Sequence, residues 1–131
     1  MIFKKHDITS ERGQTMTEFA IVLPLLVVLL FGVIQFGIAF NNYVALTDAV
    51  RAASRKGAVS RESGNPTGAC TSAGYAAAGD LKQAQLQITC SSTWQPGVDV
   101  TVTGTYPYGI KLLGWVVKSG NLKTQIKERV E

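Results

Sequence analysis

The sequence predicts an α+β chain in which one long N-terminal helix precedes a small antiparallel sheet of about three strands. Two patterns support this expectation. Residues 19–40 read FAIVLPLLVVLLFGVIQFGIAF, an uncharged run in which Gln35 is the one strongly polar residue. After residue 85, apolar and polar residues alternate, which is typical of half-buried strands. A chain of 131 residues has room for one domain at most.

The apolar run at residues 19–40 is long enough to cross a bilayer, because about 20 helical residues span a ~30 Å hydrocarbon core. A buried core helix is the alternative, but the rest of the chain is too short to wrap a helix that is apolar on every side. A secretory signal peptide would be shorter and would end in a small-residue cleavage site. Because Phe40, Asn41, Asn42 and Tyr43 follow instead, we expect a retained span whose partner is the lipid bilayer.

The helical pattern continues beyond the span as an amphipathic segment over residues 41–57. One face of this segment carries small and apolar residues at spacings of three and four: Tyr43, Leu46, Val50, Ala53 and Gly57. We therefore expect one long helix over residues 14–57, with Gly57 as its stop signal. Residues 1–13 are polar and charged, and no folded structure is expected there.

Residues 58–131 are expected to form a small β-rich domain. It should begin with a long connection over residues 58–79, in which a helix at 73–78 is only weakly indicated. Strands are predicted at 86–90 and at 98–106, joined by a turn at 95–97, with Pro107 ending the second strand. The segment from Leu122 fits a third strand, although its pattern also suits a helix. The apolar stretch 110–117 is expected in the core, while Trp115 leaves contact with a membrane or partner open.

Two cysteines, Cys70 and Cys90, lie in the C-terminal part without CxxC spacing. They predict a structural disulfide in an oxidising compartment, which would place this part outside the cytoplasm. The alternative is a pair of free thiols in a cytoplasmic domain. The formal charge of +4 does not orient the chain, because lysines and arginines flank the span on both sides.

The residue inventory argues against an enzyme. The single histidine, His6, lies in the N-terminal segment, and no nucleophile, zinc or phosphate-binding motif occurs. We therefore expect no catalytic residues, no metal, no cofactor and no small-molecule substrate. The basic residues are scattered and form no stripe interleaved with aromatics, so nucleic-acid binding is not expected either.

A short motif, GQTMTEF, stands directly before the apolar run. It resembles the type IV prepilin processing site G-x-x-x-x-E, which implies cleavage after Gly13 by a prepilin peptidase. The mature chain would begin at Gln14 with Glu18 as its fifth residue, and that carboxylate could neutralise an α-amine near lipid, its own or a neighbour's. The alternative is a capping box in which Thr15 caps the helix and Glu18 occupies the third position.

The wider segment from Gly13 resembles the TadE-like pseudopilins of the tight-adherence (Flp, type IV) pilus system, through E-F-A-x-V-L-P-L-L, F-G-x-x-x-F-G and A-L-T-x-A-x-R-x-A. The C-terminal V-x-V-T-V-x-x-x-Y-P-Y and the final R-V-E are also similar. The resemblance implies a pilin-like fold, with subunit packing through Glu18, Phe19, Pro24 and Gln35, although Gln35 stands where many relatives would be acidic.

The same resemblance implies a bacterial inner-membrane protein with a cytoplasmic N-terminus and a periplasmic C-terminal domain. Its partners would be other pilins or pseudopilins, pilus assembly proteins and the prepilin peptidase. Two roles remain open at this point. The protein could be a minor subunit that enters the fibre, or a membrane-anchored assembly factor or adaptor that stays outside it.

Overall fold

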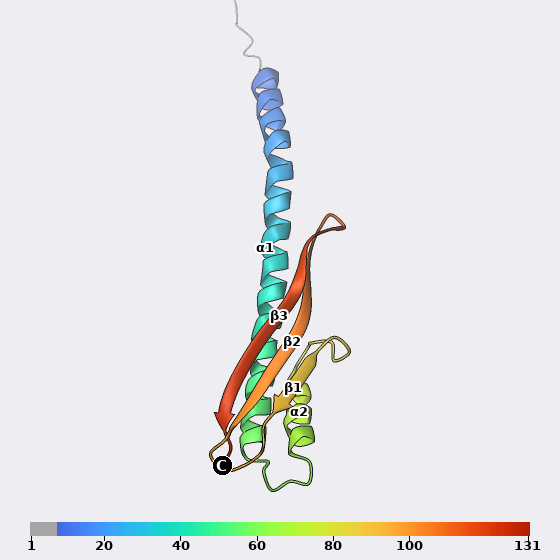
Figure 1. Ribbon diagram of the computed structural model, residues 1–131. Coiled ribbons are helices and arrows are strands. Elements are labelled where there is room, and N and C mark those ends of the chain that lie inside the picture. The colour runs from blue at the N-terminus through green and yellow to red at the C-terminus, as the bar shows by residue number, and fades with distance from the viewer. Residues whose placement is uncertain (1–7) are drawn as a thin grey trace, which may run out of the picture.

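The computed structural model describes residues 8–131, with side-chain surroundings from Arg12 onward. In chain order the elements are α1 (Ile8–Ala58), α2 (Pro66–Ala76), β1 (Gln87–Ser91), β2 (Asp99–Leu112) and β3 (Trp115–Arg129). The N-terminal half of α1 projects away from the rest, and the other elements gather around its C-terminal half (Figure 1). The predicted α+β fold class is confirmed. His6 and most of the expected leader lie outside the described residues.

Helix α1 is longer than predicted. It begins at Ile8, so the expectation of no folded structure is wrong for residues 8–13. Once the apolar segment is helical, each further residue adds a hydrogen bond without a new nucleation cost, and nothing before Gly13 blocks that extension. The helix also runs through Pro24 without a break. Its last residue is Ala58, one beyond the predicted stop at Gly57.

Helix α2 lies where the sequence predicted a long connection. The expectation of an open loop over residues 58–79 is therefore wrong for Pro66–Ala76. Asn65 starts this helix, because its side-chain oxygen accepts a hydrogen bond from the backbone N–H of Gly68 at 2.9 Å. Pro66 comes next at the first helical position, where its missing N–H costs nothing. The Asn-Pro pair is the sequence signal that marks the start of this helix.

The sheet has the order β1-β2-β3, and both pairings are antiparallel. The third strand is confirmed, but it begins at Trp115 rather than at Leu122. Pro107 does not end β2, which continues to Leu112. Since β1 begins at Gln87, opposite Thr105, no described strand pairs with that edge of β2 from Tyr106 onward, and proline is tolerated at such an edge.

The core forms where one face of the sheet packs on α1. Alternate residues of β2 are buried against the helix, and a Cβ added at Gly104 would lie 2.4 Å from Cγ2 of Val50 and 2.9 Å from Cδ1 of Leu46. The predicted helix face is buried at four of its five positions, Tyr43 being exposed. The buried cluster comprises Leu46, Ala49, Val50, Ala53, Cys70, Ala78, Leu81, Leu86, Ile88, Cys90, Val100, Val102, Tyr106 and Val130.

Carbonyl groups at the C-terminal end of α1 accept hydrogen bonds from residues outside the helix. The carbonyl oxygen of Ala58 accepts a hydrogen bond from the N–H of Glu131 at 3.1 Å, and that of Gly57 accepts one from Ser60 at 3.1 Å. Carbonyl groups at a helix end have no partner within the helix, so these two bonds satisfy part of that need. The C-terminus therefore lies beside the end of α1, as Figure 1 shows.

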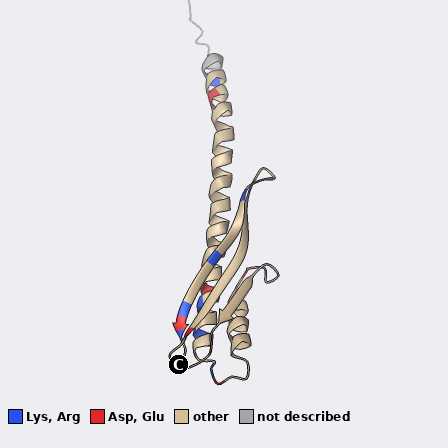
Figure 2. Ribbon diagram, in the orientation of Figure 1, with Lys and Arg blue, Asp and Glu red and all other residues tan. Residues whose placement is uncertain are grey.

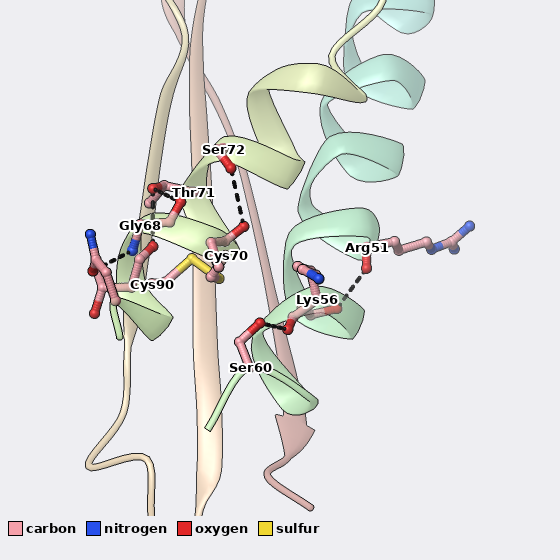
Figure 3. The surroundings of a disulfide bond; sticks show 12 residues. Arg51, Lys56, Ser60, Gly68, Cys70, Thr71, Ser72 and Cys90 are labelled. Carbon is pink, nitrogen blue, oxygen red and sulfur yellow. Dashed lines mark hydrogen bonds between the residues drawn. A yellow bond between two sulfur atoms is a disulfide. The ribbon is translucent and has the colours of Figure 1, made fainter. Parts of the chain in front are cut away.

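A disulfide joins Cys70 of α2 to Cys90 of β1, with the Cα atoms 6.4 Å apart. The predicted disulfide is thus present, but it ties a helix rather than a loop to the first strand. Figure 3 shows the bond between α2 and the strands, close to the last turns of α1. Both cysteines are buried, and Sγ of Cys70 would lie 3.1 Å from a Cβ at Gly57. Gly57 therefore gives α2 room to approach α1.

Replacement of Gly104 by Ala should destabilise the packed region by about 1–3 kcal/mol, because the added methyl group overfills the contact with Val50 and Leu46. Gly109→Ala in the same strand is the matched control, since a Cβ there meets nothing within 4 Å. Thermal unfolding of the detergent-solubilised full chain, followed by near-ultraviolet circular dichroism, measures both. Equal melting temperatures for the two variants would contradict this packing.

Removal of the disulfide in the double variant Cys70→Ala, Cys90→Ala should lower the free energy of unfolding by about 3 kcal/mol, because the cross-link restricts the unfolded chain. The wild-type protein in reductant should lose a similar amount. Denaturant unfolding with and without reductant measures the difference, and non-reducing peptide mapping identifies the bond. Finding both thiols free in the mature protein would show that the bond does not form in the cell.

Candidate processing and assembly site

The first turns of α1 carry the motif that precedes the apolar run. Gly13, Gln14, Thr17 and Glu18 are all exposed. The side-chain amide of Gln14 donates a hydrogen bond to Oε1 of Glu18 at 3.1 Å, and the hydroxyl of Thr17 donates one to the carbonyl oxygen of Gly13 at 2.9 Å. These residues therefore form one accessible surface at the end of the helix that lies away from the sheet (Figure 1).

Helical geometry places the carboxylate of Glu18 beside Gln14. Residues four apart share a face of an α-helix, and side chains lean toward the N-terminus. The hydrogen bond between the two side chains shows that this approach occurs here. An α-amine created on Gln14 would thus arise one helical turn from a carboxylate of its own chain.

The capping-box explanation of Glu18 does not fit the helix that is present. An N-cap residue must stand at the first position of a helix, where the backbone N–H groups lack intrahelical acceptors. Helix α1 begins at Ile8, so Thr15 lies well inside it. The chain as described therefore gives Glu18 no capping role.

Gly13 has no packing role among the described residues. A Cβ added there would meet nothing within 4 Å, in contrast to Gly57, Gly74 and Gly104, which all adjoin other elements. A helical glycine costs about 1 kcal/mol relative to alanine, so a glycine without close neighbours is unfavourable for the fold alone. Gly32 and Gly37 of the same helix share this property, so contacts within the chain explain none of the three.

The apolar run after the motif is exposed on every side. Between residues 19 and 40 no side chain is buried, and Phe19, Val22 and Phe31 are among the exposed large hydrophobics. Helix α1 is long and apolar enough to cross a membrane. Figure 2 shows the same stretch as a length of helix without a charged residue, between charges near its start and charges in the packed region.

The four residues expected to pack against other subunits all lie along this part of α1. Pro24 and Gln35 are eleven residues apart, or about three turns, and therefore share a face. Glu18 and Phe19 lie on other sides of the helix. Gln35 is half-exposed. Their role in packing against other subunits stays a prediction.

Comparison with known protein families finds a match on this helix. The family model described as TadE-like protein matches residues 13–55. This helix carries a TadE-like segment. The match begins at Gly13 and ends three residues before the end of α1, so it covers the motif, the apolar run and most of the amphipathic face. The resemblance predicted from the sequence is confirmed for this region.

Residues 56–131 lie beyond the TadE-like match. No curated protein and no solved structure matches the chain. Within the described residues, no group of three or more histidine, cysteine, aspartate or glutamate side chains is placed to hold a metal ion. The TadE-like helix is therefore the feature from which a function can be argued.

Proposed function

We propose that the protein is a pilin-like structural subunit, a pseudopilin or minor pilin, needed to assemble a tight-adherence type IV pilus. Its TadE-like helix anchors it in the bacterial inner membrane, and a prepilin peptidase removes the leader by cutting after Gly13. The observation that carries this proposal is the exposed Gly13–Gln14–Glu18 arrangement at the entrance to an apolar helix, within the TadE-like match.

Cleavage after Gly13 would create a new cation at the membrane surface, the α-amine of Gln14. An unpaired charge near hydrocarbon is costly, and a carboxylate within reach offsets that cost. Glu18 already approaches Gln14 in its own chain. In a bundle of packed helices the same carboxylate would serve a neighbour's α-amine and fix the axial register between subunits.

The disulfide supports a periplasmic location for the packed region. Structural disulfides persist in oxidising compartments, and in bacteria the periplasm is one of them. Cys70–Cys90 therefore favours a cytoplasmic N-terminus and a periplasmic C-terminal part. The partners in this arrangement are lipid, other pilins or pseudopilins, assembly proteins and the peptidase.

Cleavage by itself does not separate a fibre subunit from an assembly factor that stays in the membrane. Sheared pili separate the two. A processed chain found in the sheared fraction is a minor subunit, and a processed chain confined to the membrane is a factor that helps to start or organise assembly.

Substitution of Gly13 by Val should block processing, because a branched side chain occupies the position where the peptidase requires none. Intact mass of the protein extracted from its host should show residues 1–13 retained. Gly32→Val is the matched control, since Gly32 is also helical and also has no atom within 4 Å of an added Cβ. A functional wild-type pool that keeps residues 1–13 would remove the proposed processing and leave a plain membrane anchor.

Substitution of Glu18 by Gln should leave insertion and cleavage normal but reduce pilus number about tenfold or more, because the partner cation would stay unpaired near lipid. The shape and the hydrogen bond from Gln14 can both be kept by glutamine. Cross-linking to partner pilins and a count of surface pili measure the effect.

Asp48→Asn is the control for Glu18→Gln, since Asp48 is an exposed acid on the same helix, 3.7 Å from Arg51 and beyond the apolar run. Neutralising an exposed pair of this kind changes little. Normal cross-links and normal piliation in the Glu18 variant would show that its charge has no part in assembly.

A further inference from the structure

The β2–β3 hairpin is longer than the rest of the sheet requires. Strand β1 begins at Gln87, opposite Thr105, but β2 and β3 stay paired beyond that point as far as Leu112 and Trp115. This extension points toward the N-terminal half of α1, away from the packed core (Figure 1). The end of the hairpin therefore lies on the side of the molecule from which the apolar helix projects.

The hairpin tip, defined as Leu112, Leu113, Trp115, Val116 and Val117, was expected in the core, and that expectation is wrong. Trp115 is 83% exposed and Leu113 is 73% exposed, while Val116 and Val117 are also exposed. The tip is too far from the core cluster to be covered by it, since that cluster reaches no further along β2 than Tyr106.

The turn at the tip is also unusual for an aqueous loop. Leu113 and Gly114 both have positive φ, at 50° and 88°, which is the conformation of a two-residue hairpin turn. Asn or Asp normally precedes the glycine of such a turn, because these polar residues tolerate positive φ. Leucine at this position gains neither turn propensity nor burial within the chain. An apolar environment outside the chain would account for it.

The position of the hairpin indicates what that environment is. A groove of about 310 Å³ lies between the hairpin and α1. It is lined by Tyr108, Ile110 and Leu122 of the hairpin and by Phe36, Ala39, Phe40 and Tyr43 of α1. The hairpin thus runs beside the last turns of the apolar run. The tip continues beyond the groove, so it reaches the level of the membrane once the apolar run is inserted.

We propose that the hairpin tip is a second membrane contact, which inserts into the leaflet nearest the sheet and lies among the lipid headgroups and the first carbons of their chains. This inference rests on the proposed membrane insertion of α1. The ligand is a lipid surface rather than one lipid species, and the contact holds the sheet against the bilayer beside the helix.

The charges beside the tip favour lipid over a protein partner. Lys118 pairs with Ile110, and Lys111 pairs with Val116, so two lysines directly adjoin the apolar residues. Lysine side chains reach from apolar surface to headgroups, and anionic lipid attracts them. Tryptophan is enriched at the same boundary. Apolar residues and one tryptophan flanked by two lysines are typical of an interfacial anchor. Protein interfaces, in contrast, are depleted in lysine.

The backbone limits the depth of insertion. Among the described residues, the outer edge of β2 has no partner strand beyond Thr105, and β3 pairs on one side alone. Backbone groups on such edges cannot be left unsatisfied in the hydrocarbon core, where no water reaches them. The tip therefore stays in the hydrated boundary layer, about 5–10 Å deep.

Fluorescence of Trp115 tests the proposal in the full chain. The sequence contains two tryptophans, so Trp94→Phe leaves Trp115 alone. This variant is reconstituted in liposomes of phosphatidylethanolamine and phosphatidylglycerol, with or without lipids brominated near the headgroup or near the chain end. Trp115 emission should fall about twofold with headgroup-proximal bromines and less with deep ones, as expected for a residue ~5–10 Å deep.

Two matched single-tryptophan variants make the outcome decisive. Trp115→Phe leaves Trp94, which packs partly against the core and should not be quenched. Phe31→Trp in the background without Trp94 and Trp115 reports the apolar run and should be quenched most by deep bromines. Quenching of the Phe31→Trp variant without quenching of Trp115 overturns the hairpin contact and leaves the proposed function intact.

The two remaining outcomes also test the proposals. No quenching of either residue shows that α1 is not inserted, which overturns both proposals. Unquenched but blue-shifted Trp115 emission that depends on protein density shows that another protein chain covers the tip, and this result overturns the lipid contact.

Discussion

The close approach of β2 to α1 at Gly104 sets the direction of the other elements. Because no side chain stands between them, the strand lies directly on Leu46 and Val50. That contact aligns the β2–β3 hairpin along the helix rather than across it (Figure 1). The alignment then places Tyr108 and Ile110 beside Phe36 and carries the tip toward the apolar run. Nearer the end of the helix, Gly57 lets Cys70 of α2 approach closely, and Gly74 of α2 in turn lies close to Ala53 of α1 and Ile88 of β1.

The main features of the fold could be predicted from residue patterns with a clear period. The alternation at Val98–Tyr106 and the three-four spacing from Leu46 to Gly57 each describe a surface that is apolar on one side. Burial follows those sides except at Val98, which is exposed. Where the residue pattern has no such period, the predicted elements were wrong. Helix α2 is rich in small residues, so its sequence shows no apolar stripe, and only Asn65 and Pro66 mark its start. The first residues of α1 are helical because they extend the apolar helix, and their own composition does not indicate it.

The extent of β2 and the exposure of the hairpin tip could not be derived from hydrophobicity. Residues 110–117 are apolar, and an apolar stretch in a small domain normally predicts core. The structure has no room for it there, because the helix face opposite β2 is already covered by Val100, Val102, Gly104 and Tyr106. The hydrophobicity of a residue predicts that its side chain will be removed from water. It does not distinguish between the interior of its own chain, a neighbouring protein and a lipid surface.

The same distinction separates the residues of the candidate site from the residues that build the fold. Gly57 and Gly104 are explained by contacts within the chain, whereas Gly13 and Gly32 meet nothing among the described residues. The same division separates Val102, which is buried, from Phe31 and Trp115, which are exposed. Gly13, Gly32, Phe31 and Trp115 lie at the entrance to the apolar run, in the run itself and in the hairpin beside its far end. The proposed contacts with a peptidase, a neighbouring subunit and a bilayer fall at these places. The part of the sequence that the fold does not explain is therefore the part from which the function is argued.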